Sequence, residues 1–241
     1  MQLFKLSTKL HRSETFAEFA KDFELNEHDL VLTNEFIYQP FMEKLGLPCR
    51  FVMQEKYGQG EPSDEMMNSI LRDLGGASFR RVIAIGGGTV IDIAKLFVIK
   101  DLTDVMDAFD HKIPLIKDRQ LVIVPTTCGT GSEVTNISIA EIKSRHTKMG
   151  LADDVIVADD AVIIPELLAG LPFRFYAASS IDALIHAVES YVSPKCNPYT
   201  RVFSVAAMDT IIDVFKKIAA TSPEERHKYA ADMLIAANLA G

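Results

Sequence analysis

Short apolar runs alternate with amphipathic stretches over the first 165 residues of the chain. The apolar runs are rich in strand-forming residues and predict strands at residues 3–6, 30–33, 50–54, 81–85, 120–124, 134–140, 155–157 and 161–164. The amphipathic stretches have helical spacing and predict helices at residues 16–23, 36–45, 63–74 and 90–100, with Ser63 as a helix cap. This alternation predicts an α/β fold with a parallel sheet, from which residues 134–148 depart as an excursion.

The strand pattern stops at Pro165, and only helices are expected after it. These helices are predicted at residues 165–169, 173–191, 198–219 and 223–240. The change in composition near residue 175 predicts an α/β domain at 1–175 and an all-helical domain at 176–241. The last helix is apolar and small-residued on most sides, so it needs neighbours on several faces. Because few helices follow residue 175, we expect this helix to be incompletely covered and the helical domain to be truncated.

Composition and charge narrow the class of protein. The 241 residues are 48% hydrophobic, enough for a large core, and no apolar run approaches the ~18 residues of a membrane span. A formal net charge of −8 argues against nucleic-acid and anionic-membrane partners. The N-terminus has no secretory pattern, and the three cysteines are widely spaced. These features predict a cytoplasmic protein with reduced thiols.

A run of glycines follows the strand predicted at residues 81–85. The turn consists of Gly86, Gly87, Gly88 and Thr89. Such a turn lets the backbone approach a phosphate, and the free amides at the start of the next helix then point at the anion. That helix is predicted at residues 90–100, with Asp92 in its first turn. The G-x-G-x-x-G fingerprint is absent. A tight turn that only packs a helix on a strand is the alternative, and the entropic cost of three glycines favours phosphate binding.

A loop rich in hydroxyl groups, Pro125–Thr135, follows the strand at residues 120–124. None of its small polar side chains could form a core. Open parallel sheets bind ligands at the carboxyl ends of their strands, so hydroxyls and free amides there indicate a ligand site. A Ser/Thr-rich surface loop is the alternative.

Asp182 and His186 are four residues apart in the helix predicted at 173–191, and therefore lie on one face of it. A carboxylate and an imidazole in this arrangement can share a divalent metal ion. Their neighbours are apolar nearly all round, so we expect the helix to be buried. The alternatives are that Asp182 merely complements the helix dipole and that His186 is a core histidine bonded to Glu189 or Ser190.

Three motifs together resemble the iron-containing (group III) alcohol dehydrogenases. They are Gly86–Asp92, Pro125–Thr135 and Asp182–Glu189, and their order and spacing make the resemblance specific. Within that family, residues 56–63, Cys128 and residues 145–148 are similar to the 4-hydroxybutyrate dehydrogenases. The resemblance implies a dinucleotide-binding α/β domain and a helical domain of the dehydroquinate synthase type. It also implies a metal-dependent NAD(P) enzyme that interconverts 4-hydroxybutyrate and succinate semialdehyde by hydride transfer in the cleft between the domains.

The resemblance further implies a cofactor site. The turn from Gly86 to Thr89 would hold the pyrophosphate, and the remaining residues implied are Asn34, Thr126, Thr127, Thr130, Thr135 and Lys148. Many NAD-using members carry an acidic residue at the position of Asn34. A neutral amide binds ribose hydroxyls and repels a 2′-phosphate less strongly, so NAD is preferred and NADP is the alternative.

The metal implied by the resemblance is Fe²⁺, with Zn²⁺ as the alternative, and Asp182 and His186 match its first two ligands. The family takes two more histidines from helices beyond the position of Gly241. The other histidines of this chain match no ligand position: His11, His28, His111, His146 and His227. We therefore expect nucleotide affinity, weak metal binding and little turnover, and assign no catalytic side chain.

Two other functions stay open: a non-catalytic dinucleotide-binding fragment, and a dehydrogenase of the same family acting on another small primary alcohol. The hydroxyl-rich loop argues against a glycerol dehydrogenase or a dehydroquinate synthase. The intact protein is expected to be a homo-oligomer whose partner molecules are small alcohols and aldehydes.

Overall fold

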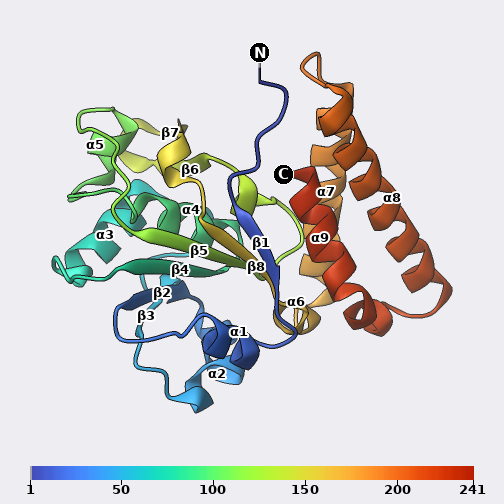
Figure 1. Cartoon of the computed structure of the whole chain (residues 1–241), viewed down its shortest axis with the longest axis horizontal. Helices are drawn as coiled ribbons and strands as arrows, with labels where there is room; N and C mark the ends of the chain where they lie inside the picture. Colours follow the sequence, from blue (N-terminus) through green and yellow to red (C-terminus); the bar gives the residue numbers. More distant parts are fainter. Residues whose placement is uncertain (1) are drawn as a thin grey trace.

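A parallel six-stranded sheet forms the centre of the N-terminal part in the computed structural model, which describes residues 2–241 (Figure 1). The strands lie in the order β1-β8-β5-β4-β2-β3, and each neighbouring pair is parallel. Their bounds are Lys9–Arg12 (β1), Asp29–Thr33 (β2), Arg50–Met53 (β3), Arg81–Gly86 (β4), Gln120–Pro125 (β5) and Asp160–Ile163 (β8). The predicted α/β fold is confirmed.

Helices cover both faces of this sheet. In β4, Val82 and Ala84 face one core while Ile83 and Ile85 face the other, because alternate side chains of a strand point to opposite faces. The first face is covered by α3 (Asp64–Leu74), α4 (Gly88–Leu96) and α5 (Val105–Phe109), and the second by α1 (Phe16–Asp22) and α2 (Glu35–Phe41) (Figure 1). Burial on both faces explains why the strands appear in the sequence as continuous apolar runs.

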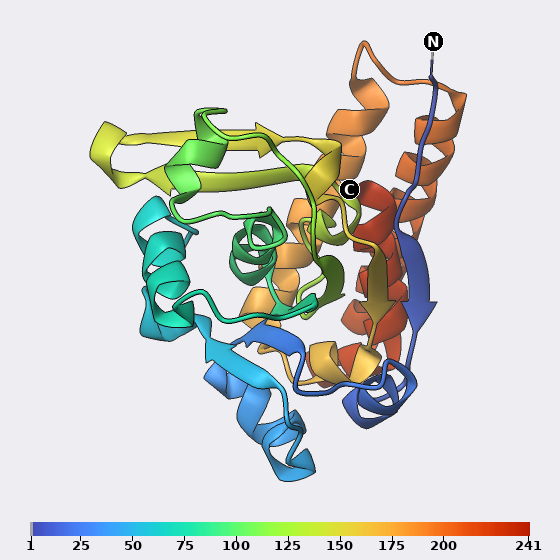
Figure 2. The same cartoon turned by 60° about the vertical axis from the view of Figure 1, so that its left-hand side comes forward.

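An antiparallel hairpin of β6 (Ile137–Ile142) and β7 (Thr147–Ala152) lies apart from the main sheet, as predicted for the excursion (Figure 2). Two predicted strands are wrong. Residues 3–6 form no strand, and the ring of Phe4 instead packs against those of Tyr199 and Phe203 in the helical part. Residues 155–157 form no strand either, because a 3₁₀ turn at Asp154–Ile156 takes their place. The Asp153 side chain accepts a hydrogen bond from the Val155 N–H and starts this turn.

The helical part consists of α6 (Pro165–Ala169), α7 (Phe173–Val192), α8 (Pro198–Ala220), a 3₁₀ turn at Pro223–Tyr229 and α9 (Ala230–Ala240). The predicted helix at 223–240 is thus two elements. The predicted domain boundary at residue 175 falls in the first turn of α7 and stays a prediction. No helix within residues 2–241 is long and apolar enough to cross a membrane.

Burial in the helical part differs from expectation. Helix α9 packs on α6, α7 and α8 and against β8, and its Met233 and Leu234 are fully buried. Ile235 is 40% exposed, so the expected incomplete cover is limited to one side of the helix. The prediction that helix α7 is buried is wrong for one of its faces. Its Ala183 face packs in the core, whereas Ile185 on another face is 50% exposed, because no other described element covers that side. Apolar composition all round a helix does not supply neighbours on all sides.

Candidate active site

A groove of about 950 Å³ opens where the strands of the sheet end, and we call it the strand-end groove. Residues from four strand ends, those of β2, β3, β4 and β5, and from the start of α7 line it. They include Asn34 after β2, Gly87, Gly88 and Thr89 after β4, Thr126 and Thr127 after β5, and Phe175 of α7. Most of the cofactor residues predicted from the sequence thus face one groove.

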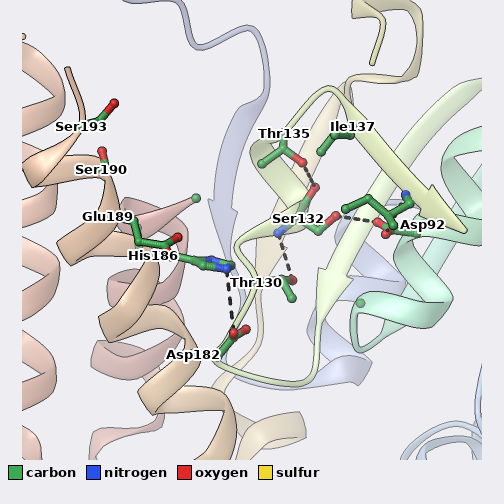
Figure 3. A pocket seen from close by; sticks show the side chains of 14 residues that line it. Asp92, Thr130, Ser132, Thr135, Ile137, Asp182, His186, Glu189, Ser190 and Ser193 are labelled. Carbon is green, nitrogen blue, oxygen red and sulfur yellow. Dashed lines mark hydrogen bonds and ion pairs between the residues drawn. The ribbon is translucent and has the colours of Figure 1, made fainter. Parts of the chain in front are cut away.

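A second hollow of about 560 Å³ lies between the hydroxyl-rich loop and α7, and we call it the α7 cavity. Thr130 and Thr135 line this cavity instead of the groove, together with Asp182 and His186 (Figure 3). Gly88 lines both hollows. The two therefore adjoin at the first residue of α4.

The glycine turn has the geometry of a phosphate cradle. Gly87 is the N-cap of α4 and makes no side-chain cap hydrogen bond, so the first amides of the helix are available to a ligand. A Cβ on Gly86 would lie 2.6 Å from Val90, so the close approach of β4 and α4 requires glycine there. Helix α4 begins at Gly88, earlier than predicted. Asp92 therefore lies in the second turn, not the first, and leaves the helix start free of negative charge.

Asp182 and His186 face each other across one turn of α7. The His186 Nε2 lies 3.8 Å from the Asp182 Oδ1, and the two side chains are 37% and 47% exposed (Figure 3). Metal–ligand bonds to nitrogen and oxygen are about 2.0–2.2 Å long, so this separation fits two ligands of one ion. Gly129 allows the loop to approach, since a Cβ there would lie 3.2 Å from the Asp182 Oδ2.

The donor set at this pair is limited. Within residues 2–241 no group of three or more histidine, cysteine, aspartate or glutamate side chains is placed to hold a metal ion. The ion-pair contact of His186 is with Asp182, and not with the Glu189 considered from the sequence. The pair fits two ligands of a divalent ion, fewer than the three protein ligands of a typical catalytic zinc site.

A buried lysine anchors the hydroxyl-rich loop to α4. The Nζ of Lys95, which is fully buried, donates hydrogen bonds to the Ser132 Oγ at 2.7 Å, the Thr135 Oγ1 at 2.9 Å and the Ile137 carbonyl at 2.7 Å. Burial lowers the pKa of the Lys95 ammonium to about 8, and the carboxylate of Asp92 opposes this shift. The hydroxyl of Thr135 is therefore engaged in holding the loop.

The same loop is attached to α9 on its other side. The Glu133 carboxylate accepts a hydrogen bond from the Asn238 Nδ2 at 3.1 Å, and complete burial raises the pKa of Glu133. Gly131 has a φ of +60°, and a Cβ there would lie 2.5 Å from the Ala237 carbonyl oxygen. The loop is thus held between α4 and α9, which fixes the wall of the α7 cavity.

Lys148 lines neither hollow. Its Nζ pairs with the Glu61 Oε2 at 2.6 Å, and both side chains are exposed. The pair joins β7 to the segment that carries Gly60, which lines the strand-end groove. A place near the cofactor stays a prediction for Lys148.

Sequence reasoning missed some residues around the groove. Gln54 and Phe175 line it, and Glu55 hydrogen-bonds to Asn34. Gln54 is the last residue of the predicted strand at 50–54 and Glu55 follows it, so their place at a strand end was available as a signal. Phe175, at the start of a helix, offered none.

Comparison with known proteins points in one direction. Residues 8–165 match the sequence profile described as iron-containing alcohol dehydrogenase, and residues 176–241 match that described as Fe-containing alcohol dehydrogenase family, C-terminal. The chain is 50% identical over its whole length to a 4-hydroxybutyrate dehydrogenase of Clostridium kluyveri, and spans 65% of that relative. It is 32% identical over 230 residues, 89% of its length, to a long-chain-alcohol dehydrogenase of Geobacillus thermodenitrificans, and covers 56% of it.

Solved structures show the same fold. The crystal structure of a sulfoacetaldehyde reductase from Bifidobacterium kashiwanohense in complex with NAD⁺ matches with a TM-score of 0.84 at 18% identity. The match covers 98% of this chain and 65% of that one. A 1,3-propanediol oxidoreductase matches with a TM-score of 0.81 at 20% identity, over 99% of this chain and 64% of that one.

Proposed function

Since this chain belongs to the iron-containing alcohol dehydrogenase family, we propose that it binds a nicotinamide dinucleotide in the strand-end groove and serves the interconversion of 4-hydroxybutyrate and succinate semialdehyde. The choice of substrate is supported by the 50% identity to the Clostridium kluyveri enzyme. The observation that carries the proposal is the position of Gly88, which lines both the groove and the α7 cavity. A dinucleotide bound at the glycine turn is therefore adjacent to Asp182 and His186.

Different residues of the strand-end groove suit different parts of the dinucleotide. The free amides at the start of α4 suit the pyrophosphate, because they carry the partial positive charge of the helix end. Asn34, after β2, suits the adenosine ribose, as residues at this place do in α/β dinucleotide sites. Thr126 and Thr127 lie beyond the neighbouring strand end and line the path between the two.

Asp182 and His186 are the residues that would hold the metal. When bound, a divalent metal supplies Lewis-acid stabilisation of the substrate oxygen. The negative charge of the Asp182 carboxylate would offset part of the positive charge of the metal ion. The His186 imidazole must be neutral to donate its lone pair. Anchoring of the loop wall by Lys95 keeps the opposite side of the cavity in place.

The test is NADH oxidation by succinate semialdehyde with added Fe²⁺ under anaerobic conditions. We expect a slow, metal-dependent rate, because the described side chains supply two ligands and affinity falls with ligand number. Succinate semialdehyde should react about tenfold faster than butyraldehyde, which lacks the carboxylate and any charge–charge contact it makes. Equal rates with the two aldehydes would contradict the proposed substrate.

A second candidate function, a dinucleotide-binding module without catalysis, is favoured by the same limited donor set. It predicts that NADH binds and that no rate appears at any Fe²⁺ concentration. NADH fluorescence titration alongside the rate assay distinguishes the two functions, since the dehydrogenase must bind both NADH and Fe²⁺ and the module only NADH.

A further inference from the structure

A hydrogen-bonded network at the end of β2 fixes the side chain of Asn34. Its Nδ2 donates to the Glu55 Oε2 at 3.0 Å and to the Gln54 Oε1 at 3.3 Å. Gln54 is fixed in turn, because its Nε2 donates to the Gly58 carbonyl at 2.9 Å. Asn34 and Gln54 are 8% and 5% exposed. Both amide groups are therefore held in one orientation.

That orientation leaves Asn34 with an acceptor for a ligand. Both hydrogens of its Nδ2 are used, and no side chain or backbone amide of residues 2–241 donates to its Oδ1. Turning the amide over would place the Oδ1 against the carboxylate of Glu55, two acceptors in contact, so the network excludes it. Asn34 lines the strand-end groove, and it presents an acceptor oxygen there as a carboxylate would.

Glu55 adds the negative charge that position 34 lacks. Its Oε1 accepts a hydrogen bond from the backbone N–H of Glu35 at 2.5 Å, so the carboxylate already occupies the N-terminus of α2. A ligand anion would have to compete with it for that position. A second carboxylate lies beside it, that of Glu35, and the exposed Nζ of Lys56 is 4.0 Å from the Glu35 Oε2. The carboxylates of Glu35 and Glu55 outnumber the single ammonium of Lys56, so this end of the groove has a net negative charge.

We propose that Glu55, acting with Asn34, makes the groove select NAD, with its free 2′-hydroxyl, over NADP. The residue at the end of the second strand meets the adenosine ribose in sites of this kind. A ribose hydroxyl can donate to the Asn34 Oδ1. A 2′-phosphate dianion has no hydrogen to donate, and the group brings a charge of about −1.5 to −2 toward Glu55. This inference rests on the proposed dinucleotide site and adds the residue that selects the cofactor.

The test is the ratio of the NADPH and NADH dissociation constants, measured by nicotinamide fluorescence in the wild type and in Glu55→Gln. We expect the wild type to bind NADH at least about tenfold more tightly than NADPH, because like charges repel across a short distance. In Glu55→Gln the ratio should fall about tenfold, mainly through tighter NADPH binding. Glu43→Gln removes the same charge from an exposed side chain beyond α2 and should leave the ratio unchanged.

Salt gives an independent readout. Raising NaCl from about 50 to about 500 mM should narrow the wild-type ratio and leave that of Glu55→Gln nearly constant, because salt screens the repulsion. Glu55→Ala, with thermal unfolding measured for each variant, must shift the ratio in the same direction. An unchanged ratio in both Glu55 variants, with NADH still bound, overturns this inference and leaves the proposed function standing. Absence of NADH binding in the wild type overturns both.

Discussion

The Nζ of Lys95 lies 2.7 Å from the Ser132 Oγ, and this contact ties α4 to the loop that forms one wall of the α7 cavity. Lys95→Met keeps the buried stem and removes the ammonium, which leaves three acceptors without their donor. We expect the free energy of unfolding to fall by about 2–4 kcal/mol, since unpaired buried polar groups retain their desolvation cost. Urea denaturation measures it.

The matched control for this prediction is Lys217→Met. Lys217 forms an exposed i,i+4 pair with Asp213 on α8. Its loss should leave the unfolding midpoint unchanged, because exposed ion pairs contribute little. If Lys95→Met behaved like Lys217→Met, the buried network would have no role in stability.

The pH dependence of stability provides a second test of Lys95. Its pKa is about 8 in the folded chain and 10.5 ordinarily, so between these values the unfolded chain holds a proton that the folded chain has released. The unfolding free energy contributed by this group therefore rises with pH in that window, by at most about 1.4 kcal/mol per pH unit.

The measurement is the difference in unfolding free energy between the wild type and Lys95→Met from pH 7.5 to 10, which cancels the other titrating groups. The unfolding free energy of the wild type should increase relative to that of Lys95→Met as pH rises. A difference that is constant or moves the other way would show that burial does not lower the pKa of Lys95 in the folded chain.

The sheet could be predicted because parallel strands covered on both faces appear as apolar runs, as β4 and β5 do. Burial of α7 could not be predicted, because a helical pattern shows how apolar a segment is and not how many other elements pack against it. Ile185 and Ala183 are both apolar residues of the same predicted helix, yet Ile185 is half exposed and Ala183 is fully buried.

The candidate site divides in the same way. The glycine turn and the pair Asp182 and His186 are local patterns, and the sequence placed them correctly at strand ends and on one helix face. Lys95 and Glu55 were missed. Lys95 is bonded to residues 37 to 42 positions away, and Glu55 is 21 positions from Asn34. Contacts of that range depend on the tertiary fold.

Metal affinity tests the pair on α7. Asp182→Asn should weaken Co²⁺ binding, measured by calorimetry, about tenfold or more, because it removes the negatively charged donor of the pair. Thermal unfolding should not change, since the carboxylate is 47% exposed. Glu189→Gln, which lines the same cavity, is the control and should leave Co²⁺ affinity intact. Equal losses in both variants would indicate general charge attraction instead of coordination.

The most direct measurement is the NADH affinity of Gly88→Ala. A Cβ on Gly88 would meet Thr130 at 3.5 Å, an ordinary contact, so the folded chain accepts the methyl group and its thermal unfolding should be unchanged. The methyl would nevertheless stand at the start of α4, where the groove and the α7 cavity adjoin. We predict that NADH binds about tenfold or more weakly than to the wild type, because the pyrophosphate needs close approach to the backbone there. Unchanged NADH affinity in a stably folded Gly88→Ala would contradict the placement of the cofactor on this turn.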